Sequence, residues 1–485
     1  MAKKSQLKVL MVSTEVNPYS KSGGLGDVAG SLPKALRKKK VDISVVLPLY
    51  KSVPAHLIEN ATVVANFTVH LSWRAQEATV LALDETGKGD FVYFIKNDHY
   101  FNRDGYYGYG DDFERFAFFS KAAIEMLHHI DFAADILHFN DWHTGLGPTF
   151  LRDIYRQFSY YANMKSLMTI HNLNYQGIFG REVLWDVGLN DGYFTNGDLE
   201  FNGKISLLKA GIIHADAVST VSETYAQEIQ TPSYGYGMDG MLYKRGTVEG
   251  NLYGITNGID TVENNPKTDK RIFAKFDAKT LDKKRENKHR LQEALGLPVS
   301  DVPMFSMITR LAEQKGFDIM SIIMDELLSQ DVQLVILGTG EQRYENMLRE
   351  HAWRYHGKLS ANITFDATLA QRIYAGSDMF LMPSVYEPCG LGQLFAMRYG
   401  TIPIVRKTGG LADTVQHFNT EAGTGNGFLF EDYVASGLMW AIREALNVYG
   451  TENWEVLVRN AISGDYSWSK AADKYVEMYK KILEA

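Results

Sequence analysis

The chain has 485 residues and a formal net charge of −8, with 45% hydrophobic and 22% charged residues. This composition excludes disordered, collagen-like and coiled-coil chains, and the length predicts about two to four domains. The mild acidity argues against a nucleic-acid-binding protein, which would carry a basic surface.

Targeting and redox features favour a cytoplasmic protein. The first apolar run is interrupted by Glu15 and is too short for a signal peptide, and no apolar run is long enough to span a membrane. The sole cysteine, Cys389, allows neither an intramolecular disulfide nor a cysteine zinc site. We therefore expect no membrane partner, no nucleic-acid partner and no metal.

Short apolar runs alternate with amphipathic segments along the chain. Helical patterns are predicted at 113–128, 223–229 and 391–399. This alternation is typical of βαβ units and parallel sheets, in which ligand loops lie at the carboxyl ends of strands. The predicted buried strands are 9–12, 43–47, 136–139, 166–170, 217–221, 304–308, 334–337, 379–382 and 402–405.

A polar and charged segment, 261–290, separates two halves of the chain. We interpret its charges as the exposed face of a solvated connecting helix. The predicted halves are residues 1–258 and 259–485.

One motif occurs in both halves. Residues 21–27 and 407–413 both read K-x-G-G-L-x-D, each between an apolar run and a helix-like stretch. Gly23 and Gly24 would let the backbone approach a ligand, the following helix start would favour an anion, and Lys21 would add a full charge. The alternative is a tight turn without a ligand. The repeat predicts two Rossmann-like domains whose loops face each other across a cleft.

Two loops of the second half carry charged residues directly after predicted strands. Arg310 and Lys315 follow the run 304–308, where they are suited to grip a diphosphate, although surface ions would have the same spacing. Glu387 and Gly390 stand between the run 379–382 and a helix start, which suits a ligand with both hydroxyls and a phosphate. An exposed loop carboxylate is the alternative. Cys389 has no histidine nearby in the sequence to make it a nucleophile.

Polar residues also end two predicted strands of the first half. Asp141 and His143 follow one strand, and His171 and Asn172 follow the next, so they would converge at one edge of the sheet. Their spacing matches no standard zinc pattern. Residues 91–119 are rich in aromatics, and 106–112 are interpreted as a flexible, exposed loop whose tyrosines stack on sugars or pack in the core.

The dinucleotide fingerprint G-x-G-x-x-G and the phosphate loop G-x-x-x-x-G-K-[ST] are both absent. The motifs K-S-G-G-L-G-D-V, N-D-W-H, T-I-H-N, T-N-G-I-D, R-L-A-E-Q-K-G and E-P-C-G-L-G-Q, in this order, resemble the bacterial glycogen synthase and plant starch synthase family. The similarity runs from about residue 8 to the C-terminus. It implies a GT-B fold, and a retaining transfer of glucose from ADP-glucose to the non-reducing 4-hydroxyl of an α-1,4-glucan such as glycogen, without a cofactor.

The resemblance also implies domain roles. Residues 1–258 form the acceptor-side Rossmann-like domain, residues 259–465 bind the nucleotide sugar, and 466–485 form a helix that crosses back to the first domain. The motifs predict no oligomeric state.

Site residues follow from the resemblance position by position. The catalytic group would comprise Glu387, His171, Asp141, Arg310 and Lys315, with the last two neutralising the diphosphate. The remaining residues would bind substrate: Lys21, Gly23, Gly24, Asn172, Asn257, Tyr374 near the base, and Cys389, Gly390 and Leu391 around the donor glucose and phosphate.

Two other functions remain open from the motifs. A phosphorylase or sucrose-type synthase would use the same scaffold, and a phosphorylase would carry a pyridoxal-phosphate lysine. A non-catalytic glucan-binding protein would bind glycogen through the aromatic loop but would not bind the donor.

Overall fold

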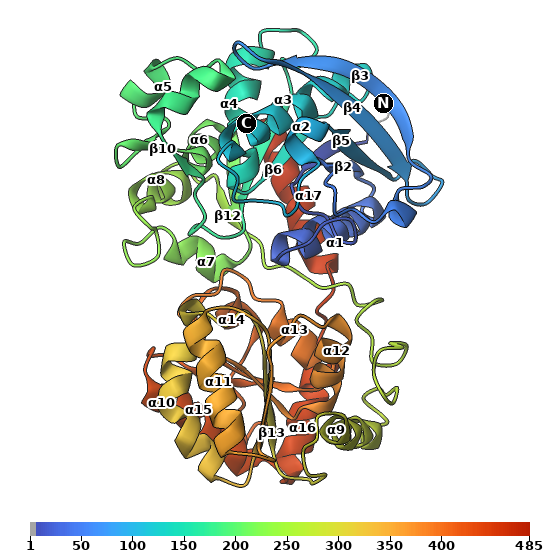
Figure 1. Cartoon of the computed structure of the whole chain (residues 1–485), viewed down its shortest axis with the longest axis vertical. Coiled ribbons are helices and arrows are strands. Elements are labelled where there is room, and N and C mark those ends of the chain that lie inside the picture. Colours follow the sequence, from blue (N-terminus) through green and yellow to red (C-terminus); the bar gives the residue numbers. More distant parts are fainter. Residues whose placement is uncertain (1–5) are drawn as a thin grey trace. The chain divides into compact units, whose positions relative to one another are not determined.

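The computed structural model describes residues 6–485, and its contacts divide the chain into two compact units. Unit 1 comprises Met1–Asn257 and Trp468–Ala485, and unit 2 comprises Gly258–Ser467. Each unit is built on a mainly parallel sheet with helices packed against it (Figure 1). The predicted two-domain α/β class is therefore confirmed.

Unit 1 contains a nine-stranded sheet with the order β12-β11-β7-β6-β1-β2-β5-β4-β3. Neighbouring strands are parallel, except that β4 is antiparallel to both β3 and β5. The strands are β1 (Lys8–Val12), β2 (Asp42–Pro48), β3 (Thr62–His70), β4 (Ala75–Asp84), β5 (Phe91–Lys96), β6 (Ile136–Asn140), β7 (Lys165–Ile170), β11 (Ala217–Thr220) and β12 (Leu252–Gly254). A second, three-stranded sheet joins β8 (Ile178–Phe179), β10 (Lys204–Ser206) and β9 (Glu200–Phe201).

The helices of unit 1 begin after the carboxyl ends of the strands, as the alternation predicts. The long helix α3 is largely buried, and its aromatic and aliphatic side chains join the core of the sheet. The helices are α1 (Gly24–Lys38), α2 (Asp98–Phe101), α3 (Asp112–His129), α4 (Leu146–Phe150), α5 (Gly192–Thr195), α6 (Leu207–His214), α7 (Glu223–Glu228), α8 (Asp239–Tyr243) and α17 (Ser469–Glu484).

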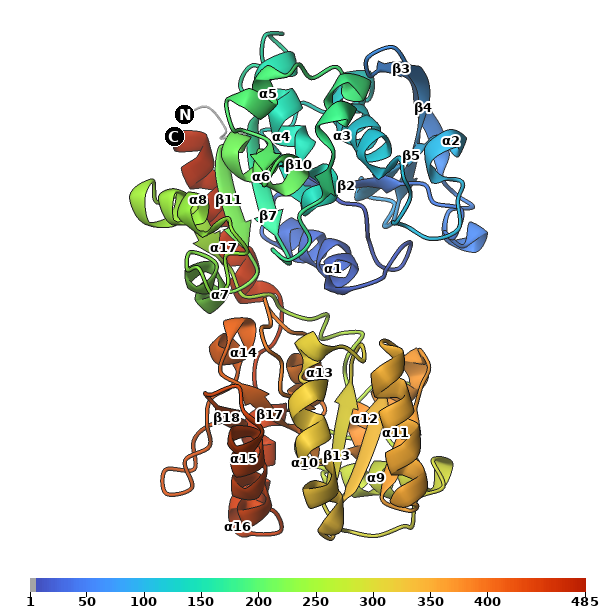
Figure 2. The same cartoon turned by 60° about the vertical axis from the view of Figure 1, so that its left-hand side comes forward.

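The last helix, α17, belongs to unit 1 although unit 2 precedes it in the chain. Its buried residues Ala471, Tyr475, Met478 and Ile482 repeat with helical spacing and form one apolar face. The hydroxyl of Tyr479 lies 2.9 Å from Nδ1 of His138 in β6, so a polar contact also fixes the helix to the sheet. Figure 2 shows α17, in red, among the elements of unit 1.

Unit 2 contains a six-stranded, fully parallel sheet with the order β15-β14-β13-β16-β17-β18. Its strands are β13 (Met304–Ile308), β14 (Gln333–Leu337), β15 (Leu359–Asn362), β16 (Met379–Met382), β17 (Ile402–Arg406) and β18 (Phe428–Phe430). The helices are α9 (Asp282–Ala294), α10 (Phe317–Ser329), α11 (Gln342–Arg354), α12 (Ala367–Gly376), α13 (Gly392–Arg398), α14 (Gly409–Thr414), α15 (Ala435–Val448) and α16 (Glu452–Ile462). No helix among residues 6–485 is long and apolar enough to cross a membrane.

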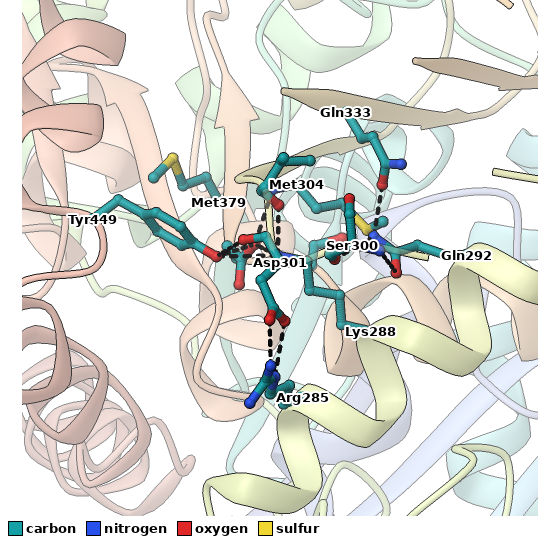
Figure 3. A network of polar contacts seen from close by, with 12 residues as sticks. Arg285, Lys288, Gln292, Ser300, Asp301, Met304, Gln333, Met379 and Tyr449 are labelled. Atoms are coloured by element: carbon teal, nitrogen blue, oxygen red, sulfur yellow. Dashed lines mark hydrogen bonds and ion pairs between the residues drawn. The ribbon is translucent and has the colours of Figure 1, made fainter. Parts of the chain in front are cut away.

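The predicted solvated helix in the segment 261–290 corresponds to α9, and the prediction is wrong for two of its lysines. Lys284 and Lys288 are 8% and 3% exposed. Nζ of Lys288 lies 2.6 Å from Oδ2 of Asp378, just before β16, and donates to the hydroxyl of Tyr449 at 3.0 Å. Figure 3 shows Lys288 and Tyr449 meeting beside Met304, where β13 begins. These charges therefore fix α9 to the amino ends of the central strands.

Lys284 is buried without a carboxylate in direct contact. Its Nζ donates to the carbonyl oxygens of Ala375 and Tyr399 at 3.0 Å each and to Oγ1 of Thr401 at 2.8 Å. These carbonyls belong to the C-terminal ends of α12 and α13, where the helix dipole favours a cation. Burial nevertheless lowers the pKa of Lys284 to about 7.

The low pKa of Lys284 predicts a specific pH dependence of stability. Between pH 7 and the ordinary lysine pKa of about 10.4, the unfolded chain binds a proton that the folded chain does not, so the free energy of unfolding rises with pH. Lys284→Met lacks this contribution. We expect denaturant unfolding to show the wild-type protein gaining stability over Lys284→Met from pH 7 to pH 9.5. Lys283→Met, at an exposed position, should track the wild type, and parallel curves for Lys284→Met would contradict the assignment.

Candidate functional site

In unit 2 the direction of the strand order reverses between β13 and β16. β13 pairs with β14 on one side and with β16 on the other. Open α/β sheets bind ligands beyond the carboxyl ends of the strands at such a point. The loops that follow these two strands, 309–316 and 383–391, contain the predicted Arg310, Lys315 and Glu387. We call these three residues the unit-2 cluster.

Lys315 and Glu387 form an ion pair across the two loops. Nζ of Lys315 lies 2.7 Å from Oε2 of Glu387, and the side chains are 17% and 9% exposed. The same carboxylate oxygen accepts a hydrogen bond from Oγ of Ser384 at 3.0 Å. Arg310 is exposed, with Nη2 3.4 Å from Oε1 of Gln314 in the same loop. The arrangement places two cations and a carboxylate at the reversal point.

Backbone contacts fix the geometry of these loops. Gly316 has φ of +82°, and a Cβ there would stand 2.2 Å from the carbonyl oxygen of Pro383. The amide of Val385 donates to the carbonyl of Gln314 at 2.9 Å. Because the loops touch through main-chain atoms, the position of Lys315 relative to Glu387 depends little on side-chain flexibility.

The second glycine pair packs against the Glu387 loop. Gly409 has φ of +45°, and a Cβ would lie 2.0 Å from the carbonyl oxygen of Glu387. The amide of Gly410 donates to this carbonyl at 3.1 Å. In unit 2 the K-x-G-G-L motif therefore supports the loop that carries the carboxylate.

The residues after Glu387 form a tight turn into α13. Cys389 is 5% exposed and Gly390 has φ of +71°, a conformation that favours glycine. Leu391 directly precedes the first turn of α13. Gln393, which the sequence analysis did not single out, is fully buried and donates through Nε2 to the carbonyls of Gly390 at 2.9 Å and Cys389 at 3.2 Å.

Tyr374, predicted to lie near the nucleobase, is largely buried in unit 2. Tyr374 is 6% exposed, and its ring packs against Phe380 and Phe395 with centroid distances of 5.3 and 5.8 Å. Its side chain lies on the sheet-facing side of α12, which the residue type alone does not reveal. An exposed aromatic ring lies in the loop between β15 and α12, where Phe365 is 87% exposed.

In unit 1 the strand order reverses between β1 and β6, which lie side by side. Asp141 follows β6 and His171 follows β7. The backbone amide of His171 donates to Oδ1 of Asp141 at 2.7 Å, and Nε2 of the His171 ring lies 2.9 Å from Oδ1 of Asn140. The structure therefore brings the predicted Asp141 and His171 together. We call Glu15, Asp141 and His171 the unit-1 cluster.

Burial shifts the protonation of this cluster. It raises the pKa of Asp141 to about 7, against the opposing effect of hydrogen bonds from the backbone amides of His171 and Asn172. It lowers the pKa of His171 to about 3, so the ring is neutral near pH 7. The amide nitrogen of Asn140 donates to backbone carbonyls, which leaves Oδ1 as the acceptor and places the His171 proton on Nε2. The site thus holds a half-ionised carboxyl beside an uncharged imidazole.

Glu15 is a buried carboxylate beside the unit-1 site that the sequence analysis did not single out as a site residue. It is 4% exposed and accepts hydrogen bonds from the amide of Ser22, the amide of Gly23 at 3.1 Å and the hydroxyl of Tyr107 at 2.7 Å. The amide of Gly23, expected to be free for a ligand anion, is therefore bound to Glu15 in this structure. A carboxylate directly after a buried strand is the sequence signal for this role.

The remainder of the first glycine loop leads into α1, which begins at Gly24. Gly23 and Gly24 are exposed, and no atom stands within 4 Å of a Cβ built on Gly23. Lys21 pairs with Asp27 at 2.7 Å, with 42% of its side chain exposed. The loop keeps open backbone and a surface cation at the carboxyl end of β1.

The two asparagines predicted to bind substrate lie in different environments. Oδ1 of Asn172 accepts from the amide of Asn174 at 3.1 Å and shapes the turn after β7. Asn257 is 7% exposed, and its Oδ1 has no hydrogen-bond donor among residues 6–485. Asn257 follows β12 and is the last residue of the first segment of unit 1.

The aromatic loop is more closely packed than the exposed loop that we predicted. Tyr106, Tyr107 and Tyr109 are all half-buried. The Tyr107 ring stacks on His143 with a centroid distance of 4.3 Å, and Tyr106 packs on Tyr50 at 4.9 Å. Hydrogen bonding between Tyr107 and Glu15 ties this loop to the glycine loop, which the sequence spacing of the two loops does not indicate.

Within the described part of the chain, no three His, Cys, Asp or Glu side chains are grouped to hold a metal ion. The positive charge available to an anionic ligand in unit 2 comes from Arg310 and Lys315.

Comparison with protein families gives two matches. Residues 8–244 match the starch synthase catalytic domain, and residues 292–462 match glycosyl transferases group 1. The glycogen synthase of Clostridium novyi is 50% identical over 481 residues, which cover 98% of this chain and 99% of the relative. The glycogen synthase of Clostridioides difficile is 47% identical over 485 residues, covering 99% and 100%.

Solved structures show a corresponding similarity. The catalytic domain of starch synthase IV from Arabidopsis thaliana, bound to ADP and acarbose, matches with a TM-score of 0.92 and 33% identity, covering 99% of this chain and all of that one. Sucrose-phosphate synthase from Thermosynechococcus elongatus shares the fold, with a TM-score of 0.60 and 18% identity over 99% of each chain. The long, high-identity matches decide the family: this chain is a glycosyltransferase that belongs to the glycogen synthase family.

Proposed function

We propose that the chain transfers glucose, with retention of configuration, from ADP-glucose to the non-reducing 4-hydroxyl of an α-1,4-glucan such as glycogen. The observation that carries this proposal is the Lys315–Glu387 pair at the strand reversal of unit 2, with Arg310 in the same loop. A nucleoside diphosphate needs fixed cations, and a sugar needs a carboxylate to accept hydrogen bonds from its hydroxyls. The unit-2 cluster supplies both.

Departure of the diphosphate is the step that these cations would favour. Breaking the anomeric bond leaves negative charge on ADP, and the ammonium of Lys315 and the guanidinium of Arg310 would stabilise that charge. When the diphosphate engages Lys315, Glu387 loses its ion-pair partner and becomes available to the glucosyl hydroxyls. The ion pair thus holds Lys315 and Glu387 at the site until the donor binds.

The unit-1 cluster would act on the glucosyl group of the same donor. The transferring sugar develops positive charge, which the carboxylate of Asp141 stabilises. Because burial keeps His171 neutral, the ring orients the sugar without adding a repelling charge. Glu15 accepts a hydrogen bond from the amide of Gly23 and thereby holds the glycine loop that carries Lys21.

Retention requires either a covalent intermediate or attack on the face from which the diphosphate leaves. Oδ1 of Asp141 is engaged by the amide of His171, and Oε2 of Glu387 by Lys315 and Ser384. Hydrogen bonds and an ion pair to these oxygens lower their nucleophilicity. We therefore favour same-face attack through a short-lived oxocarbenium ion.

The preference for adenine is supported by the starch synthase relative that is bound to ADP. In this chain Tyr374 remains the candidate for contact with the base, and the exposed ring of Phe365, at the carboxyl end of β15, is a second candidate. We also propose a cytoplasmic location, in keeping with the single cysteine.

The direct test is incorporation of label into glycogen from ADP-[14C]glucose or UDP-[14C]glucose, with and without EDTA. We expect the ADP sugar to be the better donor and EDTA to leave its rate unchanged, because fixed cations neutralise the leaving group. Preference for the UDP sugar would contradict the donor assignment. Loss of activity in EDTA, restored by Mg²⁺, would contradict the charge argument.

A further inference from the structure

A cavity of about 530 Å³ lies in unit 2 beside the edge strand β18. This volume falls within the range of small-molecule sites, roughly 300–1,000 Å³. Figure 2 shows the two elements that form it, β18 and α15, packed together. None of its residues belongs to the unit-1 or unit-2 cluster. The cavity is lined by Lys407, His417, Leu429, Phe430, Glu431, Asp432, Val434, Ser436, Gly437 and Trp440.

An aromatic platform forms one side of this cavity. Trp440, on α15, is 48% exposed, and the ring of His417 lies nearly parallel to it, with centroids 5.7 Å apart and an interplanar angle of 13°. Phe428 packs edge-on against His417 at 5.6 Å. Trp440 therefore presents part of its aromatic ring to solvent, and stacking on His417 fixes the orientation of that ring.

A backbone hydrogen bond also orients the histidine. The amide of Leu429 donates to Nδ1 of His417 at 3.1 Å, which makes Nδ1 the acceptor and places the proton of the neutral ring on Nε2. The platform therefore offers an aromatic face and a fixed N–H donor.

The polar rim of the cavity selects against an anionic ligand. Lys407 is neutralised by Glu431, whose carboxylate lies 2.7 Å away. The side chain of Asp432 has no hydrogen bond or ion pair elsewhere in residues 6–485, so it remains as a net negative charge. The cavity thus combines an aromatic face, carboxylate acceptors and the hydroxyl of Ser436. This combination suits an uncharged polyol, whose ring C–H groups stack on the aromatic face and whose hydroxyls donate to the acceptors.

We propose that this cavity, the Trp440 site, binds a segment of α-glucan away from the reacting groups. The choice of glucan rests on the proposed function, because a polymer extended by this chain is the uncharged polyol that it would meet. A second attachment point on the same polymer raises the effective concentration of chain ends at the catalytic clusters. Acceptors too short to reach both places gain nothing from it.

Trp440→Ala is the principal test, with Trp353→Ala as its matched control. Trp353 is 83% exposed on α11 in the same unit, so both variants remove a surface indole. We expect Trp440→Ala to reduce retardation in native gels that contain glycogen and to raise the KM for glycogen at least about fivefold. The KM for maltotriose, the KM for ADP-glucose and kcat should stay unchanged, and Trp440→Phe should retain most of the binding.

Two results would overturn the inference. One is equal glycogen retardation and equal KM for glycogen in Trp440→Ala and the wild type. The other is weaker ADP binding in Trp440→Ala by calorimetry, which would mark the platform as a nucleotide site. If Trp440→Ala fails to fold, Asp432→Asn and His417→Ala take its place, with the same expected rise in the KM for glycogen.

Failure of the proposed function would be distinct from failure of this inference. If the wild type incorporates no glucose but Trp440→Ala weakens glycogen retardation, the Trp440 site is supported and the proposed reaction is wrong. If the wild type transfers glucose and Trp440→Ala has the same glycogen retardation and the same KM for glycogen, the proposed reaction is supported and the Trp440 site is wrong.

Discussion

Lys315→Ala is expected to reduce the rate of glucose transfer by about two to three orders of magnitude, which is the usual effect of removing one preorganised charge donor. The ammonium is the part of the unit-2 cluster held by a short ion pair, at 2.7 Å from Glu387, and both loops are locked by main-chain contacts. The backbone of Lys315 is therefore held in the loop where we place the departing diphosphate. Initial rates of label transfer from ADP-[14C]glucose to glycogen measure the effect.

The control must distinguish a lower rate of glucose transfer from a loss of folded protein. Removing Lys315 leaves the largely buried carboxylate of Glu387 without its partner, which destabilises the fold. Lys315→Ala combined with Glu387→Gln should recover thermal stability but not activity. Lys283→Ala, which removes an exposed lysine of α9, should retain full activity. A Lys315→Ala variant with wild-type turnover would remove the basis for assigning the diphosphate to this loop.

Asp141→Asn should lower kcat by about a hundredfold, because the amide retains the shape and the backbone hydrogen bonds but lacks the charge that stabilises the glucosyl cation. With its pKa near 7, the wild-type carboxyl loses its charge as pH falls, so kcat should decline below about pH 7. The small residual kcat of Asp141→Asn should lack this decline. Profiles of kcat against pH for the two proteins provide the measurement.

The same substitution should increase stability at high pH. The folded pKa of Asp141 is raised above its unfolded value of about 3.9, so its contribution to stability is fully present below pH 4 and is lost as pH rises through 7. Asp141→Asn should therefore melt at least about 2 °C above the wild type at pH 8 and show no such gain at pH 4. If the difference in melting temperature between Asp141→Asn and the wild type is the same at pH 4 and pH 8, the buried-carboxyl assignment is contradicted.

Much of the fold was predictable because central parallel strands are buried on both faces. The apolar runs 304–308 and 379–382 coincide with β13 and β16. β3 was not predicted, because most of its residues are exposed or half-buried and they form no apolar run. β18, with three residues, is too short to give a pattern.

The charges of α9 show a different limit of the sequence. Lys284 and Lys288 stand in a charged run like that of any surface helix, and the residues that bind them, such as Thr401 and Asp378, lie about a hundred positions away in the chain. Burial of a lysine depends on partners that become neighbours only on folding.

Candidate site residues could be predicted where they lie in loops that follow predicted strands. Asp141 and His171 directly follow buried strands, and Lys315 and Glu387 lie in the loops after two others; the structure gathers them at two points of strand reversal. The burial of Tyr374 was not predictable, because residue type does not tell which face of a helix points to the core.

Calorimetric titration of ADP into the wild type and Lys315→Ala, from 50 to 300 mM NaCl, tests most directly whether fixed cations of the unit-2 cluster hold the diphosphate. We predict at least a tenfold rise in the Kd of ADP for Lys315→Ala at low salt, together with a weaker dependence on salt, since one screened charge contact is gone. Equal Kd values and equal salt dependence in the two proteins would contradict it.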